Sequence, residues 1–414
     1  MLRPIRSERT RRITFVVPSA FYAGGIARVV ATQASVLAQR GYEVTVLTLV
    51  RPTDEPVFDF DPRVRIVALQ DLRPPAGGTQ QRRRPRRDPE ADPATRRLDR
   101  QPSTLVPGAH KTITAYVDGL LREHLSALPP STVVTTRPEF AIAASRWTDP
   151  RSLIIHQEHL SFVPRPAPLR AGLRSVARGD DGARRLDALL TLTEADLERW
   201  RAFLDDPTVR TAAIPNPNPF PIGPAAPLTS KVIVAAGRMT SQKGFERLID
   251  AFAPLAASHP DWQLRIYGDG QQAADLAAQV AALGLTDHIL LPGVTDRFEE
   301  ELAASSILGM SSRWEGLGMV LLEAMSKGVP PVAFDCPEGP RQVISDGENG
   351  LLVPEGDVPA LTEALRRVMD DADLRSRLGA GALASARRFE TGSVMDRWVE
   401  LIDEIDRERA GAGS

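Results

Sequence analysis

Short apolar runs alternate with stretches of helical periodicity at the start of the chain. Residues 12–17 and 42–50 are apolar runs, and residues 26–40 place apolar side chains at intervals of three and four. The short runs are typical of buried strands, and the spacing between them is typical of an amphipathic helix. The order strand, helix, strand predicts a βαβ unit and therefore a parallel sheet.

The same alternation continues to residue 204 and begins again after a proline-rich segment. Further strands of the first series are expected at residues 64–69, 131–136, 152–155 and 188–192, and further helices at 113–128 and 194–204. Residues 205–230 contain seven prolines, which predicts a stiff linker. The second series is expected to have strands at 231–236, 263–267, 289–291, 307–310 and 331–334, and helices at 245–258, 271–283, 297–305, 319–327 and 359–369.

These two series predict an α/β protein with two Rossmann-like, open parallel-sheet domains that face a central cleft. The expected domains are residues 1–222 and residues 223–392. A final amphipathic helix within residues 393–414 is expected to pack back on the first domain. In open parallel sheets ligands lie beyond the carboxyl ends of the strands, and clefts between domains are preferred sites.

Residues 71–108 interrupt the pattern, because they contain many prolines and few large apolar residues. They predict a disordered basic insertion with its arginines concentrated at residues 82–87. One interpretation is a solvated insertion, and the other is a basic arm that contacts anionic lipid head groups or a polyanionic acceptor. No aromatic residues alternate with these arginines, so nucleic acid is not the expected partner.

Composition narrows the class of protein further. The 414 residues carry 51 Lys and Arg against 53 Asp and Glu, a net charge of −2 that gives no general attraction to nucleic acid. Cys336 is the single cysteine, which excludes an intramolecular disulfide and a cysteine-based zinc site. No apolar run approaches the roughly 18 residues of a membrane span, so a soluble cytoplasmic protein is expected.

A glycine-bounded loop with two cations follows the first strand of the second series. Arg238 and Lys243 lie five residues apart between Gly237 and Gly244, just before a predicted helix. Both cations could converge on one small anion near the helix N-terminus, or each could be an ordinary surface charge. The spacing is not that of a Walker loop. Only four of the 51 basic residues are lysines, which makes Lys243 the more informative of the two.

Two carboxylates flank the start of the predicted helix at 319–327. Glu315 precedes Gly316, Leu317 and Gly318, and Glu323 lies on the helix. Eight residues of helix span about 12 Å, which is too far for two carboxylates to share a proton. The spacing suits a ligand laid across the helix start, with an anion on the free amides and hydroxyls toward each carboxylate. The alternative is an N-terminal helix charge followed by a solvated glutamate.

Three weaker signals remain. Gly25 ends a Gly-Gly loop in the first βα turn, which permits either a tight turn or close approach of a ligand. His156 and His159 follow a predicted strand, and either one could be structural or reach a substrate. The segment 268–273 fits a loose dinucleotide-binding pattern, but it follows a later strand of its domain than that pattern requires.

The second half of the chain resembles the donor domain of family-4 glycosyltransferases, which have the two-domain GT-B fold. The matching segments are GRMTSQKG at 237–244, IYGDG at 266–270, LPG at 291–293, SSRWEG through EAM at 311–325, and DGENGLLVP at 346–354. The first half resembles the same family through GGIARVV at 24–30, EH at 158–159 and PNP at 215–217. The segment DCPEGP at 335–340 resembles the subgroup that builds exopolysaccharides, wall polymers and lipid-linked glycans.

This resemblance implies a retaining hexosyl transfer from a nucleotide diphosphate sugar, most often a UDP-sugar, without a bound metal or other cofactor. The implied acceptor is the hydroxyl of a glycan or of a lipid-linked glycan, at the inner face of the membrane. The resemblance also assigns roles to residues of this chain, each by position. The implied donor and catalytic residues are Arg238 and Lys243 for the diphosphate, Glu323 for the ribose, Glu315 with Gly316, Leu317 and Gly318 for the hexose, Gly268 and Val294 beside the base, His159 at the reacting centre, and Gly25 near the donor.

The chemistry of such a transfer is consistent with these residue types. Breaking the bond between the sugar and the phosphate places negative charge on the leaving diphosphate, which two cations and a helix N-terminus would stabilise. The rival hypotheses are a nucleotide-sugar epimerase on the same fold, a nicotinamide-dependent oxidoreductase that uses residues 268–273, and a polyanion-binding protein without catalytic activity that uses residues 82–87.

Overall fold

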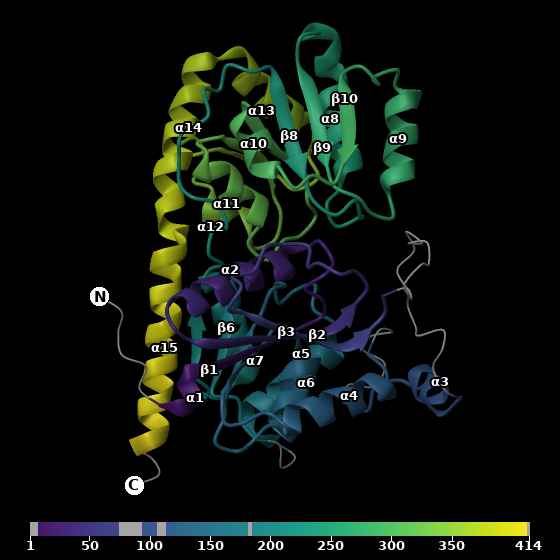
Figure 1. Ribbon diagram of the computed structural model, residues 1–414. Helices are drawn as coiled ribbons and strands as arrows, with labels where there is room; N and C mark the ends of the chain where they lie inside the picture. Colours follow the sequence, from purple (N-terminus) through teal and green to yellow (C-terminus); the bar gives the residue numbers. More distant parts are fainter. Residues whose placement is uncertain (1–6, 74–92, 106–112, 181–183, 412–414) are drawn as a thin grey trace. The chain divides into compact units, whose positions relative to one another are not determined.

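The computed structural model describes residues 7–73, 93–105, 113–180 and 184–411. The chain divides into two compact units (Figure 1). Unit 1 is Met1–Ile214 together with Met395–Ser414, and unit 2 is Pro215–Val394. The boundaries expected from the sequence, 222/223 and 392/393, lie eight and two residues away from these.

Unit 1 contains an entirely parallel sheet. Its strands are β1 (Arg12–Val17), β2 (Glu43–Arg51), β3 (Arg65–Asp71), β4 (Thr132–Thr135), β5 (Leu153–Gln157), β6 (Ala188–Thr191) and β7 (Thr211–Ala213). Their order is β3-β2-β1-β4-β5-β6-β7, so the direction in which strands are added reverses between β1 and β4. The helices that begin in unit 1 are α1 (Glu8–Arg11), α2 (Gly25–Gln39), α3 (Pro93–Arg100), α4 (Ala115–Ser126), α5 (Pro138–Trp147), α6 (Ala167–Arg178) and α7 (Glu194–Leu204).

The last helix, α15 (Thr391–Gly411), begins in unit 2 and continues in unit 1 from Met395 onward. Its apolar face is buried, and Trp398 is 1% exposed. Its polar face is tied to unit 1 by ion pairs of Arg9 with Asp406 and of Arg210 with Glu404. The C-terminal residues of the chain therefore complete the N-terminal unit.

Unit 2 contains a second parallel sheet, with strand order β10-β9-β8-β11-β12-β13. These strands are β8 (Val232–Ala236), β9 (Gln263–Tyr267), β10 (Ile289–Gly293), β11 (Ile307–Met310), β12 (Pro331–Asp335) and β13 (Leu351–Pro354). Its helices are α8 (Phe245–Ser258), α9 (Ala273–Ala282), α10 (Phe298–Ala303), α11 (Met319–Ser326), α12 (Pro340–Val343), α13 (Val358–Asp370), α14 (Ala372–Ala386) and the 3-10 turn η2 (Arg387–Phe389). Two parallel sheets confirm the predicted α/β class.

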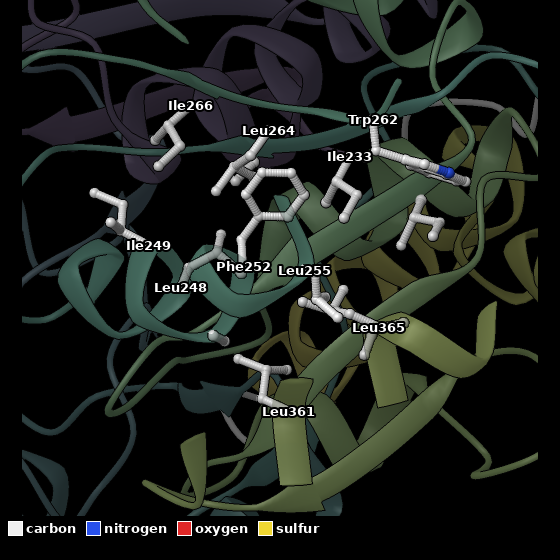
Figure 2. Close-up of a cluster of buried hydrophobic side chains, with 14 of the residues drawn as sticks. Ile233, Leu248, Ile249, Phe252, Leu255, Trp262, Leu264, Ile266, Leu361 and Leu365 are labelled. Carbon is white, nitrogen blue, oxygen red and sulfur yellow. The ribbon is translucent and has the colours of Figure 1, made fainter. Parts of the chain in front are cut away.

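The core of unit 2 lies between its sheet and the helices packed on it. Figure 2 shows Leu248 and Phe252 of α8 pointing toward Ile233 and Leu264 of the sheet, and all four side chains are fully buried. Burial of this kind supplies the main driving force for folding. It also fixes the ends of β8 and β11, from which the functional loops depart.

Two predictions made from the proline-rich segments differ from the structure. Residues 93–105 are not disordered, because α3 forms there and Asp118 accepts a hydrogen bond of 2.7 Å from the hydroxyl of the buried Ser103. The predicted linker at 205–230 includes β7, a strand of the unit 1 sheet. The basic run at 82–87 lies outside the described residues.

None of the helices in the described part of the chain is long and apolar enough to cross a membrane.

Candidate functional site

The strand order of unit 2 reverses between β8 and β11, which lie side by side although two other strands separate them in the sequence. At such a reversal the connections leave toward opposite faces of the sheet and open a crevice at the carboxyl ends of the two strands. The loop at 237–244 leaves β8, and the loop at 311–318 leaves β11. These are the two loops in which the sequence analysis found its cationic and acidic candidates.

Hydrogen bonds join the two loops directly. The amide of Arg313 donates to the carbonyl of Gln242 over 2.8 Å, and the Nε2 of Gln242 donates to the carbonyl of Trp314 over 3.0 Å. The hydroxyl of Ser311 donates to the carbonyl of Lys243 over 3.1 Å. The loops therefore form one continuous wall at the ends of β8 and β11.

Lys243 and Glu315 form an ion pair at the centre of this wall. The Nζ of Lys243 lies 2.6 Å from Oε1 of Glu315, and the same oxygen accepts a hydrogen bond of 2.6 Å from the hydroxyl of Ser312. The two charged side chains are 19% and 8% exposed. A charge-assisted contact with this little exposure fixes the ammonium group in position. The sequence analysis did not find Ser312, because nothing in its spacing shows that its hydroxyl meets Glu315.

Two glycines make this contact sterically possible. A Cβ atom at Gly237 would lie 2.9 Å from Cε of Lys243, so any other residue there would push the lysine stem from its present position. Gly244 has a φ of +59°, and a Cβ there would lie 2.6 Å from the carbonyl oxygen of Ser311. Gly244 therefore combines a left-handed backbone with close approach to the neighbouring loop.

The loop after β11 leads directly into α11. Gly318, with a φ of +81°, is the N-cap residue of α11 and provides no side-chain cap. The first amides of a helix have no intrahelical partner, so this end of α11 attracts negative charge. Glu315 precedes these amides and is 6% exposed, while Glu323 lies on α11 and is 5% exposed. The structure therefore rules out a solvated position for Glu323.

Arg238 is exposed and lies on the same loop as Lys243. Its neighbour Met239 is buried at 2% exposure, which anchors the loop beside it. Convergence of Arg238 and Lys243 on a single anion stays a prediction.

Gly268 and Val294 are brought to the edge of the same wall. The amide of Gly268 donates to the carbonyl of Gly293, the residue before Val294, over 2.8 Å. A Cβ atom at Gly268 would lie 1.9 Å from the carbonyl oxygen of Gly237. This position therefore requires glycine because two loops touch there. Val294 is 64% exposed and offers an apolar surface at the end of β10.

Gly25 and His159 belong to unit 1, so they lie in a different unit from Lys243 and Glu315. Gly25 is the first residue of α2, directly after the end of the β1 loop. His159 is half-buried, and its Nε2 atom has no hydrogen-bond partner among the described residues. Burial lowers the pKa of His159 to about 3, so its imidazole is neutral at physiological pH.

The neighbouring His156 has a structural environment. It is completely buried, with Nδ1 2.9 Å from the hydroxyl of Thr135 and Nε2 3.3 Å from a carboxylate oxygen of Glu158. Glu158 also pairs with Arg165, whose charge helps to lower the pKa of the carboxyl against the effect of burial. Of the two histidines, His159 is therefore the one whose Nε2 makes no hydrogen bond to the described residues.

Cys336 is buried near the pair of Lys243 and Glu315. Burial, and secondly the charge of Glu315, raise the pKa of its thiol to about 12. The thiol is therefore protonated at neutral pH and is a poor nucleophile. In the part of the chain that the structure describes, no group of three or more His, Cys, Asp or Glu side chains is placed to hold a metal ion.

Comparison with known proteins identifies the family. Residues 222–384 match the family model of group 1 glycosyl transferases. Over 403 residues the chain is 35% identical to an exopolysaccharide phosphotransferase of Streptomyces coelicolor. The match covers 95% of this chain and 41% of that protein. Residues 222–384 therefore form a domain of the group 1 glycosyl transferase family. The chain is also 25% identical over 394 residues to an uncharacterized glycosyltransferase of Haemophilus influenzae. This match covers 95% of this chain and all of that protein.

Solved structures show the same architecture. Anabaena HepE in complex with UDP and glucose matches with a TM-score of 0.68 and 17% identity, covering 94% of this chain and 99% of that protein. At this identity the likeness concerns the fold, and it confirms the predicted GT-B class. Because the chain spans only 41% of the Streptomyces relative, the activity of that longer protein does not transfer to it directly.

Replacement of Gly244 tests the contact between the two loops. We expect Gly244→Ala to destabilise unit 2 more than Gly284→Ala does. Both glycines have positive φ, which costs alanine about 1–2 kcal/mol, but a Cβ at Gly284 meets nothing within 4 Å. Urea denaturation measures the two free energies of unfolding. Equal losses in the two variants would show that the approach to Ser311 is not tight.

Proposed function

We propose that the protein is a retaining, metal-independent glycosyltransferase that moves a hexose from a nucleotide diphosphate sugar to a glycan hydroxyl. The observation that carries this proposal is the juxtaposition of Lys243, Glu315 and the N-terminus of α11 at the strand-order reversal of unit 2. This is the place in an open parallel sheet where nucleotides bind.

The diphosphate would lie against the amides that begin α11 and the ammonium group of Lys243. Glu315 keeps that ammonium in place before the donor arrives, and Arg238 on the same loop would add a second positive charge. Negative charge that grows on the leaving diphosphate would thus meet donors that are already oriented. Preorganised donors of this kind supply the electrostatic stabilisation for which other transferases use a metal ion.

The sugar and the ribose would lie on either side of the diphosphate. Glu315 would accept hydrogen bonds from the hydroxyls of the hexose, and the amides of Gly316–Gly318 would donate hydrogen bonds to it. Glu323 would accept hydrogen bonds from the hydroxyls of the ribose. The base would lie between Gly268 and Val294, where the end of β10 exposes an apolar side chain. Uridine is the proposed base, and the complex of Anabaena HepE with UDP and glucose supports it.

The acceptor side is proposed for unit 1. The neutral imidazole of His159, with its unpartnered Nε2, would contact the hexose or the reacting centre. In a retaining transfer without a protein nucleophile, the acceptor hydroxyl attacks the face from which the diphosphate departs. The departing phosphate oxygen then takes the acceptor proton. A growing exopolysaccharide or a lipid-linked glycan is the proposed acceptor, and the Streptomyces relative supports the polysaccharide class.

A ligand screen tests the proposed donor class. We expect UDP or a UDP-hexose to raise the Tm, because a ligand at 100 times its Kd stabilises the folded protein by about 2.7 kcal/mol. The Tm is measured in the same thermal unfolding experiment with GDP, ADP and NADH as comparison ligands. Stabilisation by NADH alone would favour the oxidoreductase hypothesis. Conversion of a UDP-hexose to an isomer in the absence of acceptor would favour the epimerase hypothesis.

Replacement of Lys243 tests the proposed diphosphate contact. We expect Lys243→Ala to lower the transfer rate about 10²- to 10³-fold, the usual cost of removing one oriented donor from a site where charge develops. Lys231→Ala is the matched control, because Lys231 is exposed and its nearest carboxylate, on Asp261, is 3.7 Å away. Release of UDP measures the rates, and circular dichroism verifies folding. A folded Lys243→Ala variant with the wild-type rate would contradict the assignment.

Removal of metal ions tests the metal-independent mechanism. We expect a saturating concentration of EDTA to leave the transfer rate within about twofold, because charge stabilisation is assigned to Lys243, Arg238 and the start of α11. A dialysed sample without EDTA is the control. A large loss of rate that Mg²⁺ or Mn²⁺ restores would assign that stabilisation to a metal ion instead.

A further inference from the structure

The two ends of unit 2 meet at one buried asparagine. The chain enters the unit at Pro215 and leaves it at Val394. Asn218 is 1% exposed, and its backbone amide donates to the carbonyl of Phe389 over 2.9 Å. Its backbone carbonyl accepts a hydrogen bond from the hydroxyl of Thr391. Asn218 thus joins the segment that enters unit 2 to the segment that leaves it.

The side chain of the same asparagine reaches α11. Its Nδ2 donates to the carbonyl of Leu322 over 2.7 Å, and its Oδ1 accepts from the amide of Phe220 over 3.1 Å. Leu322 directly precedes Glu323, the residue proposed to hold the ribose. All four polar groups of Asn218 are therefore in use, and one of them fixes the backbone next to a donor-binding residue.

The entering segment, residues 215–226, also covers the C-terminal end of α11. The amide of Gly223 donates to the carbonyl of Ser326, and the amide of Ala226 donates to the carbonyl of Lys327, each over 2.7 Å. Lys327 is 3% exposed, and its Nζ donates to the carbonyls of Pro221 and Gly223 over 3.0 and 3.1 Å. The last carbonyls of a helix lack intrahelical partners, and this segment supplies partners for them.

The helix between this cap and the proposed donor site is short. Residues 319–326 make up α11, which is about 12 Å long at 1.5 Å per residue. A two-turn helix with a buried apolar face moves as one body, so a displacement of its C-terminal end displaces the amides at its N-terminus as well.

We propose that Asn218 and Lys327 are positioning residues. Through the segments that connect the two units, they keep α11 in the position at which its N-terminal amides and Glu323 can contact the donor. The inference rests on the proposed function, because it takes Glu323 and the start of α11 as donor contacts. Neither side chain touches the donor in this arrangement. Each acts on donor binding through the position of α11.

The test compares Asn218→Ala and Lys327→Met with Asn349→Ala in the full-length chain. Asn349 is a matched control because it is also buried, at 2% exposure, and its side chain is held inside unit 2 by hydrogen bonds with Ser345, Val343 and Ser385. Those bonds do not involve α11. The Kd for UDP is measured by calorimetry on folded protein, and hydrogen exchange is measured on peptides that cover residues 319–326.

We expect all three variants to have a lower Tm, and only Asn218→Ala and Lys327→Met to bind UDP about 2- to 30-fold more weakly. The same two variants should exchange the amides of α11 faster than Asn349→Ala does. If Asn218→Ala does not fold, Lys327→Met carries the comparison, since its stem preserves the packing. Wild-type UDP affinity in a folded variant, or an equal loss in Asn349→Ala, overturns the inference. Failure of the wild-type protein to bind UDP, GDP or ADP would instead count against the proposed function.

Discussion

The candidate site depends on the pairing of β8 with β11. The register places Ile307 beside Ile233 and Leu308 beside Val234, so the loops that follow these strands leave the sheet next to each other. Neighbouring strands lie about 4.8 Å apart, which is close enough for the two loops to exchange backbone hydrogen bonds. The ion pair of Lys243 with Glu315 is a consequence of this pairing. Without this strand pairing, nothing in the sheet would bring together a lysine and a glutamate that are 72 residues apart in the sequence.

The alternation of strands and helices in unit 2 could be predicted because its strands are short and mostly apolar, and β11 and β12 are almost completely buried. The same reasoning missed a helix that is buried on all sides, because such a helix has no exposed polar face. In α5 the residues from Pro138 to Ser145 are all buried, so no amphipathic period marks the helix. A strand as short as β7, inside a proline-rich segment, gives no periodic signal either, and only its pairing with β6 defines it.

At the candidate site, the sequence pattern selected residues but could not show their contacts. Lys243, Glu315 and Glu323 were selected by spacing and by their positions around a helix start, and the structure places the first two in direct contact. The local pattern could not show this contact, because strand order is a property of the whole sheet. The resemblance to family-4 glycosyltransferases implied a role for Gly268 beside the base, but the close approach of the Gly237 carbonyl is by itself enough to require glycine there. Loop packing therefore accounts for the glycine at this position without a ligand.

Charge balance in this region restricts what it can bind. The ion pair of Lys243 and Glu315 is close to neutral as a unit, so a diphosphate at Lys243 would need further positive groups besides this pair. The start of α11 contributes roughly half a positive charge through its free amides. Arg238, exposed on the loop that also carries Lys243, would add a second positive charge. An uncharged sugar would not need either group. A ligand that carries both a diphosphate and a sugar would use the cations, the helix start and the two carboxylates together, which is the physical reason for proposing a nucleotide sugar rather than a free glycan at this site.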